Sequence, residues 1–235
     1  MARVNSTPIG HSRHIGPTML AGVIFDFDGV IVDSHPLHIE AWKELLHAKG
    51  KAVSDAELSF VREGAKREEI LRHFLGELTP EQAESYGAQK DQLFRAGVNQ
   101  LELVPGFAGF LIQLEAVGLQ SAVATSGNRP RVEHALETFS LRNRFRAVVT
   151  GNDVSRGKPD PALFLLAAQA LEVDPAHIVV FEDAVAGILA AKAAGMKCVG
   201  IAANGRESLL KEAGADLVMK DFRDVTVNDL KSLFI

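Results

Sequence analysis

Six short apolar runs, separated by amphipathic segments, constrain the fold of this chain more than any other feature of its sequence. Each run has the length of a strand and no regular alternation with polar residues, which is typical of strands buried on both faces of a sheet. The runs lie at residues 22–27, 120–125, 145–150, 177–182, 197–202 and 216–219. Helical patterns separate the later runs, at residues 105–118, 130–140, 159–173 and 183–195. This alternation predicts an α/β fold, in which helices cover both faces of a parallel sheet.

One long interval breaks the alternation. From about residue 36 to residue 104 we expect no strand, and the sequence shows helical patterns at residues 36–50, 54–64, 66–76 and 79–97. The borders of the interval carry Pro and Gly, which are typical of hinges. The sequence therefore predicts an inserted α-helical cap at residues 35–104 and a core formed by residues 20–34 and 105–235. We expect residues 1–19 to form a mobile N-terminal arm, with a transit peptide as the alternative.

Composition and charge narrow the range of partners. The 235 residues are 47% hydrophobic, which is enough to bury a substantial core. The formal net charge is −5 and basic residues are dispersed, so we expect no nucleic-acid partner. The single cysteine, Cys198, cannot form an internal disulfide, and no apolar run approaches the roughly 20 residues of a membrane span. We therefore expect a cytoplasmic protein with no membrane partner, as a monomer or a weak homo-oligomer.

Acidic side chains follow two of the apolar runs. Open parallel sheets bind their ligands at the carboxyl ends of the strands, so the residues directly after each run are the candidates for a site. Asp26 and Asp28 lie at the end of the first run, and Glu182 and Asp183 lie at the end of the fourth. Carboxylates gathered at one edge of a sheet form an oxygen-rich set of ligands, which suits Mg²⁺. The sequence therefore predicts a site that holds this cation.

Hydrogen-bond donors and a lysine are expected at the same edge. The second run leads into a loop of hydroxyl and amide groups, formed by Thr125, Ser126, Gly127 and Asn128. This loop opens onto a predicted helix, and the first turn of a helix binds anions well. Lys158 follows the third run and stands between Gly and Pro. Each stretch alone is also typical of a turn, a helix cap or a solvated charge, but together they predict a catalytic site.

The motifs that hold these residues resemble those of the haloacid dehalogenase superfamily of phosphatases and phosphomutases. They stand in this sequence as DFDGV, VATSG, GKPDP and FEDAVAGI, and residues 20–235 fit the pattern. The resemblance is closest to the β-phosphoglucomutase-like group, in which a helical cap follows the first strand. It implies a Rossmann-like core and an enzyme that acts on a small phosphorylated metabolite, most of all a sugar phosphate.

The resemblance also implies a role for each motif residue. Asp26 would be the nucleophile that forms an aspartyl-phosphate, and Asp28 would be the general acid and base. Thr125, the amides that follow it, and Lys158 would hold the phosphoryl oxygens. Mg²⁺ would be held by the carboxylates of Asp26 and Asp183 and the backbone carbonyl of Asp28, assisted by Glu182.

Three residues of the predicted cap extend the resemblance to the mutase. The stretch EGAKREE matches the cap motif G-x-x-R-E, which would make Arg67 a clamp for a substrate phosphate. His38 and Lys90 fall near positions that the mutase also uses. The loop after the second strand departs from the mutase pattern, because the mutase has a lysine where this chain has Asn128 or Arg129. Asn128 cannot supply a cation there, whereas Arg129 can.

Several activities fit these residues. We expect a Mg²⁺-dependent phosphatase, and the alternative is a β-phosphoglucomutase, which would pass the phosphoryl group to a sugar hydroxyl instead of water. A phospho-receiver-like binding module also combines acids, Thr, Lys and Mg²⁺, but no cap interrupts its sheet. Dehalogenation is not expected, because members with that activity lack the metal carboxylates and the second aspartate of the first motif.

Overall fold

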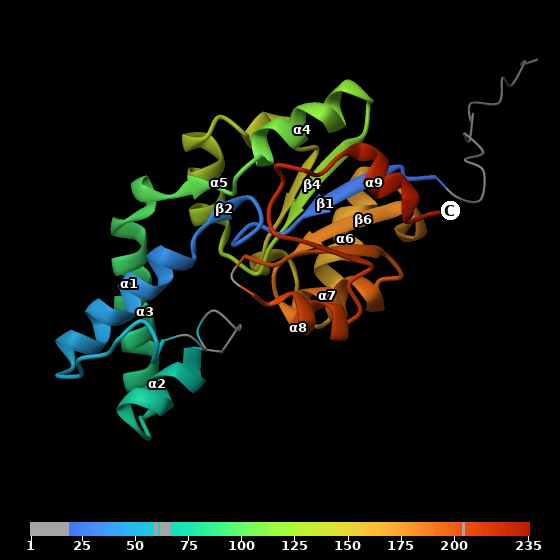
Figure 1. Cartoon of the computed structure of the whole chain (residues 1–235). Helices are drawn as coiled ribbons and strands as arrows, with labels where there is room; N and C mark the ends of the chain where they lie inside the picture. Colours follow the sequence, from blue (N-terminus) through green and yellow to red (C-terminus); the bar gives the residue numbers. More distant parts are fainter. Residues whose placement is uncertain (1–18, 59–60, 62–66, 204) are drawn as a thin grey trace, which may run out of the picture.

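The computed structural model of this protein describes residues 19–58, 61, 67–203 and 205–235. In these residues, six parallel strands form one sheet in the order β5-β4-β1-β6-β7-β8 (Figure 1). The strands are β1 (Gly22–Phe25), β4 (Gln120–Ala124), β5 (Ala147–Val149), β6 (Ile178–Glu182), β7 (Lys197–Ile201) and β8 (Leu217–Met219). Each predicted run contains one strand, and the predicted α/β core with a parallel sheet is confirmed. Nearly all of the predicted N-terminal arm lies outside the described residues.

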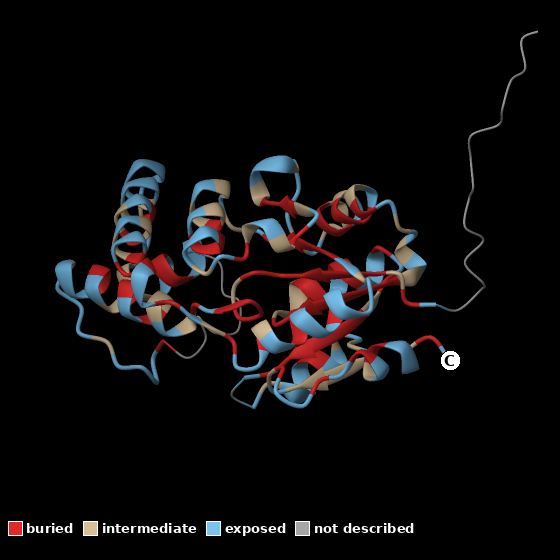
Figure 2. Cartoon of the chain, turned by 90° about the horizontal axis from the view of Figure 1, so that it is seen from above, coloured by how far each residue is buried: buried red, intermediate tan, exposed pale blue. Residues whose placement is uncertain are grey.

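Helices cover the two faces of the sheet. One face packs against α4 (Phe107–Ala116), α5 (Arg129–Thr138) and α9 (Val227–Ser232). The other face packs against α6 (Ala162–Leu171), α7 (Val185–Ala193) and α8 (Glu207–Glu212). Alternate residues of β1 supply the two cores, because successive side chains of a strand point to opposite faces: Phe25 joins the first cluster and Ile24 the second. Figure 2 shows buried residues concentrated in the strands and on the inner sides of these helices.

Phenylalanine rings dominate the first of these clusters. Phe25 stacks on Phe181 of the neighbouring strand, with ring centroids 5.1 Å apart. Phe110 of α4 and Phe222 contact the same pair, at centroid distances of 5.4 Å and 5.1 Å from Phe181. All of these rings are buried. The cluster lies directly beneath the ends of β1 and β6, so it fixes the residues that follow these two strands.

Three further helices lie beside the sheet, in the interval predicted as the cap (Figure 1). They are α1 (His35–Ala48), α2 (Arg67–Leu75) and α3 (Pro80–Ala96). They share a smaller core of their own, which includes Trp42, Leu45 and Ile70. Thr79 begins α3 with a capping box, in which its side chain accepts from the Gln82 amide and the Gln82 side chain accepts from the Thr79 amide. The exact division into core and cap stays a prediction.

Two details of this interval differ from the prediction. Residues 55–58 form a turn rather than the regular helix predicted at 54–64, although Ser54 and Glu57 make the reciprocal hydrogen bonds of a capping box. Residues 59–60 and 62–64 of that prediction lie outside the described residues. The second difference is a strand where none was expected, β3 (Glu102–Leu103). Two residues are too short to show the alternation of a strand.

The new strand joins the two connections between the helical insert and the sheet. β3 pairs with β2 (Val32–Asp33) in antiparallel register, with Val32 opposite Leu103. The Val104 amide also donates to the Ile31 carbonyl, at 3.0 Å. The outgoing and returning chains therefore run as one short ribbon near the carboxyl end of β1.

No helix among the described residues has both the length and the apolar character needed to cross a membrane. The expectation of a cytoplasmic monomer or weak homo-oligomer stays a prediction.

Two residues of α4 test the position of the core. Phe110→Ala should lower the free energy of unfolding by about 3 to 5 kcal/mol, because the change removes a fully buried ring and leaves a cavity among the aromatic side chains. Ile112 is 57% exposed on the same helix, so Ile112→Ala should change stability by about 0.5 kcal/mol or less. Urea unfolding followed by circular dichroism measures both variants, and equal losses would contradict this packing.

Candidate active site

Three carboxylates meet at the carboxyl edge of the sheet. Asp26 follows β1, Glu182 ends the neighbouring strand β6, and Asp183 comes next. β1 and β6 pair in register, with Phe25 opposite Phe181, so the acids that follow project from the same edge. One oxygen from each of the three carboxylates lies within 4.8 Å of the others, and all three residues are buried. The structure therefore brings these three acids together at the strand ends, where the sequence analysis expected them.

Lys158 lies between two of these acids. Its ammonium donates to Oδ1 of Asp26 and, at 2.7 Å, to Oε2 of Glu182. Its side chain is only 8% exposed. Burial alone would lower the pKa of Lys158, but the two carboxylates raise it above its ordinary value. The lysine is therefore a fixed positive charge at the sheet edge.

Burial raises the pKa of both Asp26 and Glu182, and Lys158 opposes this effect. Glu182 is held further by backbone amides, because its Oε1 accepts from Asp183 at 3.2 Å and from Ala184 at 3.1 Å. Gly187 leaves space for this carboxylate, since a Cβ at that position would lie 2.0 Å from its Cδ. The first turn of α7 thus fixes the orientation of Glu182.

Asp183 contacts the helical insert as well as the sheet. Its Oδ2 lies 2.9 Å from Nε2 of His35, the first residue of α1, and 3.9 Å from a guanidinium nitrogen of Arg206. Burial lowers the pKa of His35, but the hydrogen bond to Asp183 raises it, and the net shift is upward. Gly29 has φ +76° and a Cβ there would lie 2.3 Å from Oδ2 of Asp183, so only glycine fits this turn. Sequence reasoning did not identify His35 or Arg206.

The loop after β4 lies beside this acidic edge, as predicted from the strand order. Thr125 is buried, and its Oγ1 accepts from the Gly127 amide at 3.1 Å. Asn128 begins α5, and its side chain accepts from the Arg131 amide at 3.1 Å. Ser126 is exposed. Ser126, Gly127 and Asn128 line the cavity described below, whereas Thr125 does not.

Arg131 is the main residue of the site that the sequence analysis missed. One guanidinium nitrogen donates to Oδ1 of Asp28 at 2.8 Å, and the second donates to Oδ2. Burial raises the pKa of Asp28, but the charge and hydrogen bonds of Arg131 hold it well below its ordinary value. Asp28 is therefore a carboxylate in this structure.

Arg129 does not supply the cation that we expected at this loop. Its guanidinium donates to Glu133 at 3.1 Å, to Asp153 and to the Val148 carbonyl. Successive residues of a helix are about 100° apart, so Arg129 and Arg131 point to nearly opposite sides of α5. The helical periodicity of the segment could have indicated which arginine faces the site.

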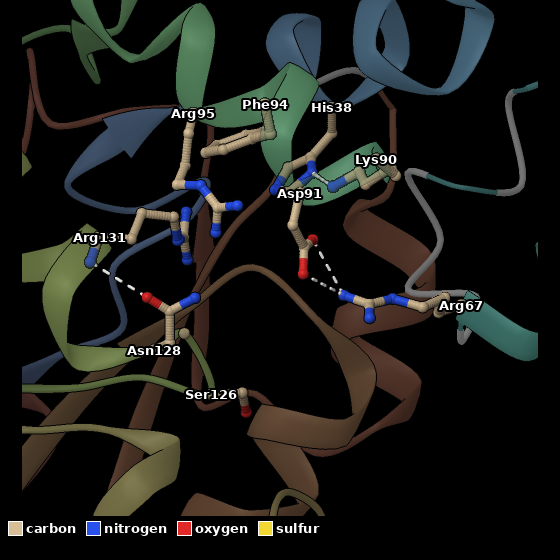
Figure 3. Close-up of a pocket in the computed structure, with 10 residues that line it drawn as sticks. His38, Arg67, Lys90, Asp91, Phe94, Arg95, Ser126, Asn128 and Arg131 are labelled. Carbon is tan, nitrogen blue, oxygen red and sulfur yellow. Dashed lines mark hydrogen bonds and ion pairs between the residues drawn. The ribbon is translucent and has the colours of Figure 1, made fainter. Parts of the chain in front are cut away.

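A cavity of about 340 Å³ lies between the sheet edge and the helical insert (Figure 3). Its lining comes from both parts of the chain and consists of His38, Arg67, Lys90, Asp91, Phe94, Arg95, Ser126, Gly127, Asn128 and Arg131. The three predicted cap residues are all in this lining. Arg67 donates to both carboxylate oxygens of Asp91, at 2.8 Å and 2.9 Å. Basic side chains therefore outnumber acidic ones around the cavity.

Lys90 and His38 form a close pair in the wall of the cavity. Nζ of Lys90 lies 2.6 Å from Nδ1 of His38, and the lysine is 5% exposed. Burial lowers the pKa of Lys90 to about 8. Burial and the nearby Lys90 lower the pKa of His38 to about 3, so this imidazole is neutral and its Nδ1 accepts a hydrogen bond from the lysine ammonium. The charge of the cavity therefore changes in the alkaline range.

The Lys90 pKa predicts a pH-dependent stability. Between about pH 8 and the ordinary lysine value of 10.5, the unfolded chain binds a proton at Lys90 that the folded chain does not, so wild-type stability rises with pH. Lys90→Met removes this site, and its stability relative to wild type should fall by roughly 1.4 kcal/mol per pH unit across the window. Urea unfolding at several pH values measures the difference, and a difference independent of pH would contradict the burial of a titrating lysine.

The parallel sheet, its acidic edge and the cavity beneath inserted helices define the class of this protein, an enzyme with a Rossmann-like core and a helical insert over its active edge. The family model for haloacid dehalogenase-like hydrolases matches residues 23–201. The chain belongs to this family, and within it to the β-phosphoglucomutase-like group. The resemblance seen in the sequence motifs is thereby confirmed.

Relatives of two activities match nearly the full chain. A validoxylamine A 7'-phosphate phosphatase of Streptomyces hygroscopicus subsp. limoneus is 38% identical over 209 residues, which cover 86% of this chain and 94% of the relative. A beta-phosphoglucomutase of Bacillus subtilis (strain 168) is 33% identical over 218 residues, covering 88% and 92%. The crystal structure of a HAD hydrolase, family IA, variant 3, from Entamoeba histolytica HM-1:IMSS matches with a TM-score of 0.82 and 27% identity, covering 91% of this chain and 99% of that one.

Proposed function

We propose that this enzyme is a Mg²⁺-dependent phosphatase that hydrolyses a small phosphorylated metabolite. The substrate class that we expect is a sugar phosphate, and the reaction would pass through an aspartyl-phosphate at Asp26. The observation that supports this most is the arrangement of Asp26, Lys158 and Glu182 at the sheet edge, beneath a cavity with basic walls. A carboxylate can attack phosphorus only where cations offset the repulsion between two anions. The relative that is a 7'-phosphate phosphatase supports the hydrolytic activity.

The residues at the edge fit a Mg²⁺ ion. The three carboxylates offer only oxygen ligands, lie within 4.8 Å of one another and are buried. We assign the ion to Asp26, Asp183 and the backbone carbonyl of Asp28. Glu182 is a supporting acid because both of its oxygens already accept hydrogen bonds, Oε2 from Lys158 and Oε1 from two backbone amides. Mg²⁺ usually keeps several positions for water and substrate phosphate. When bound, it would neutralise negative charge on the phosphoryl oxygens.

The proposed reaction has two steps, and the residues of the site divide the work between them. Asp26 attacks phosphorus, and the bond between phosphorus and the leaving oxygen breaks while Asp28 protonates that oxygen. Water then attacks the aspartyl-phosphate and gives its proton to Asp28, which releases inorganic phosphate and restores Asp26. Arg131 holds Asp28 as a carboxylate in this structure, which is the form that accepts the proton from water. The first step uses the protonated form of Asp28, and the proton taken from water in the second step restores that form for the next turnover. Lys158 and Thr125 would hold the phosphoryl oxygens.

Asp26→Asn tests the covalent role directly. The amide keeps the shape of the side chain but is not a nucleophile, so kcat should fall at least a hundredfold. This loss is at least as large as the smallest rate effect expected from one general acid or base, which is about a hundredfold. Release of inorganic phosphate from a panel of sugar phosphates measures the rate. Asp224→Asn, at an exposed position, is the control for the loss of one acid. If Asp26→Asn retained more than about a hundredth of the wild-type rate, Asp26 would not be the nucleophile.

Mg²⁺ should stabilise the protein in the absence of substrate. A ligand that binds only the folded state at a hundred times its Kd raises the free energy of unfolding by about 2.7 kcal/mol. The Tm of wild type should therefore rise with Mg²⁺ and fall back after chelation with EDTA. Asp183→Asn should lose most of this rise, because it removes a ligand oxygen, whereas Asp224→Asn should keep it. An equal rise in Tm for both variants would show that Asp183 is not a ligand of the metal ion.

A second candidate function is β-phosphoglucomutase. Arg67 and Arg131 line the same cavity from the insert and from α5, and a mutase needs cations for the phosphate that is not being transferred. The beta-phosphoglucomutase relative is a further reason to test it. A coupled assay for glucose 6-phosphate formed from β-glucose 1-phosphate separates the two activities. Isomerisation that is stimulated by glucose 1,6-bisphosphate and exceeds phosphate release would favour the mutase.

A further inference from the structure

We propose that Asp91 is a specificity-determining residue of the cavity, and that its pair with Arg67 recognises hydroxyl groups on the neutral part of a sugar monophosphate. The inference rests on the proposed function, because it concerns the substrate of the same cavity. It narrows that substrate to phosphate esters in which the group next to Asp91 donates hydrogen bonds.

The pair forms between two helices of the insert. Arg67 is the first residue of α2, and one of its guanidinium nitrogens donates to both carboxylate oxygens of Asp91 on α3, at 2.8 Å and 2.9 Å (Figure 3). Both side chains line the cavity, and they are 42% and 33% exposed. A carboxylate and a guanidinium in direct contact have no net charge. This wall of the cavity is therefore polar but neutral.

The surface of α3 is shaped to receive the arginine. Gly87 lies one helical turn before Asp91, so the two residues share a face of α3. Gly87 is buried, and a Cβ there would lie 2.6 Å from Nη1 and 2.9 Å from Cδ of Arg67. Glycine is unfavourable inside a helix, but here its missing side chain makes room for the guanidinium. The geometry of the pair is thus set by the backbone of α3 as well as by the two charges.

The hydrogen-bonding capacity of the pair matches hydroxyl groups. Both contacts with Asp91 come from one nitrogen of Arg67, so three of the five N–H groups of Arg67 do not serve Asp91. Each carboxylate oxygen of Asp91 also keeps a lone pair. A hydroxyl group both donates and accepts, so neighbouring hydroxyls can donate to Asp91 while they accept from Arg67. A second phosphate or carboxylate only accepts, and Asp91 repels it.

Asp91 is the only acid among the described residues that line the cavity. The cations of the lining, such as Lys90 and Arg131, attract every phosphate ester. A carboxylate among them adds a requirement that cations cannot impose, because the substrate group beside it has to be a hydrogen-bond donor. Asp91 is therefore the residue of this lining that distinguishes a hydroxyl from an anion.

Deoxy analogues test the recognition of hydroxyls. Glucose 6-phosphate and its 2-, 3- and 4-deoxy analogues would be bound to the Asp26→Asn protein with Mg²⁺ and measured by calorimetry, which avoids turnover. At least one deoxy analogue should bind about tenfold more weakly than glucose 6-phosphate, because it leaves a charged group of the pair without its hydroxyl partner. Asp91→Ala, made in the same Asp26→Asn background, should reduce this difference to about threefold or less.

A bisphosphate tests the second part of the inference. Asp91→Ala leaves Arg67 without its carboxylate, so the affinity for glucose 1,6-bisphosphate relative to glucose 6-phosphate should rise about tenfold. Adding Arg67→Gln should remove this gain. Glu84→Ala is the matched control, because Glu84 is an exposed acid of the same helix and does not line the cavity. It should leave both the deoxy difference and the bisphosphate ratio unchanged.

The outcomes separate this inference from the proposed function. Equal or undetectable binding of the four monophosphates, a deoxy difference that survives Asp91→Ala, or an unchanged bisphosphate ratio overturns the role of Asp91. Equal effects of Glu84→Ala and Asp91→Ala also overturn it. If wild type still releases phosphate in an Asp26-dependent manner, the phosphatase proposal stands. A deoxy difference that depends on Asp91, combined with no phosphate release from any sugar phosphate, supports the role of Asp91 and overturns the phosphatase proposal.

Discussion

The ammonium of Lys158, buried between Asp26 and Glu182, is the interaction on which the rest of the active edge depends. Three carboxylates so close together would otherwise repel one another in a place that water hardly reaches, and each would favour its neutral form. A single cation keeps this set compatible with a folded sheet. Two glycines leave the space that the acids need, because a Cβ at Gly29 would meet Asp183 and a Cβ at Gly187 would meet Glu182.

The two sides of the active site have opposite electrostatic character. The sheet edge is acidic and attracts cations, which suits a metal ion. The cavity under the insert is basic and attracts anions, and it is lined by Lys90, Arg95 and Arg131. Arg131 connects the two sides, since it binds Asp28 at the edge and also faces the cavity. In the function that we propose, chemistry and substrate recognition are divided between two parts of the chain that face one cavity.

The sequence predicted the sheet and its acidic edge because both follow from strong, local signals. Buried parallel strands are continuous apolar runs, and the position after a strand specifies where a side chain such as Asp26 lies. Arg131 and His35 escaped prediction for a different reason: each is a polar residue at the start of a helix, where such residues are common. Only the tertiary arrangement of α5 and α1 brings them to Asp28 and Asp183. β3 escaped because its pairing with β2 is a tertiary contact without a sequence pattern.

The short ribbon formed by β2 and β3 limits how the insert can move. Two independent tethers would let three helices tumble over the sheet in many orientations, but two tethers that are hydrogen-bonded to each other behave as a single strip. The insert then has few rotational degrees of freedom relative to the sheet. A ligand that touches both walls of the cavity has to restrict only those few, so more of its contact energy remains for affinity and for selectivity between similar molecules.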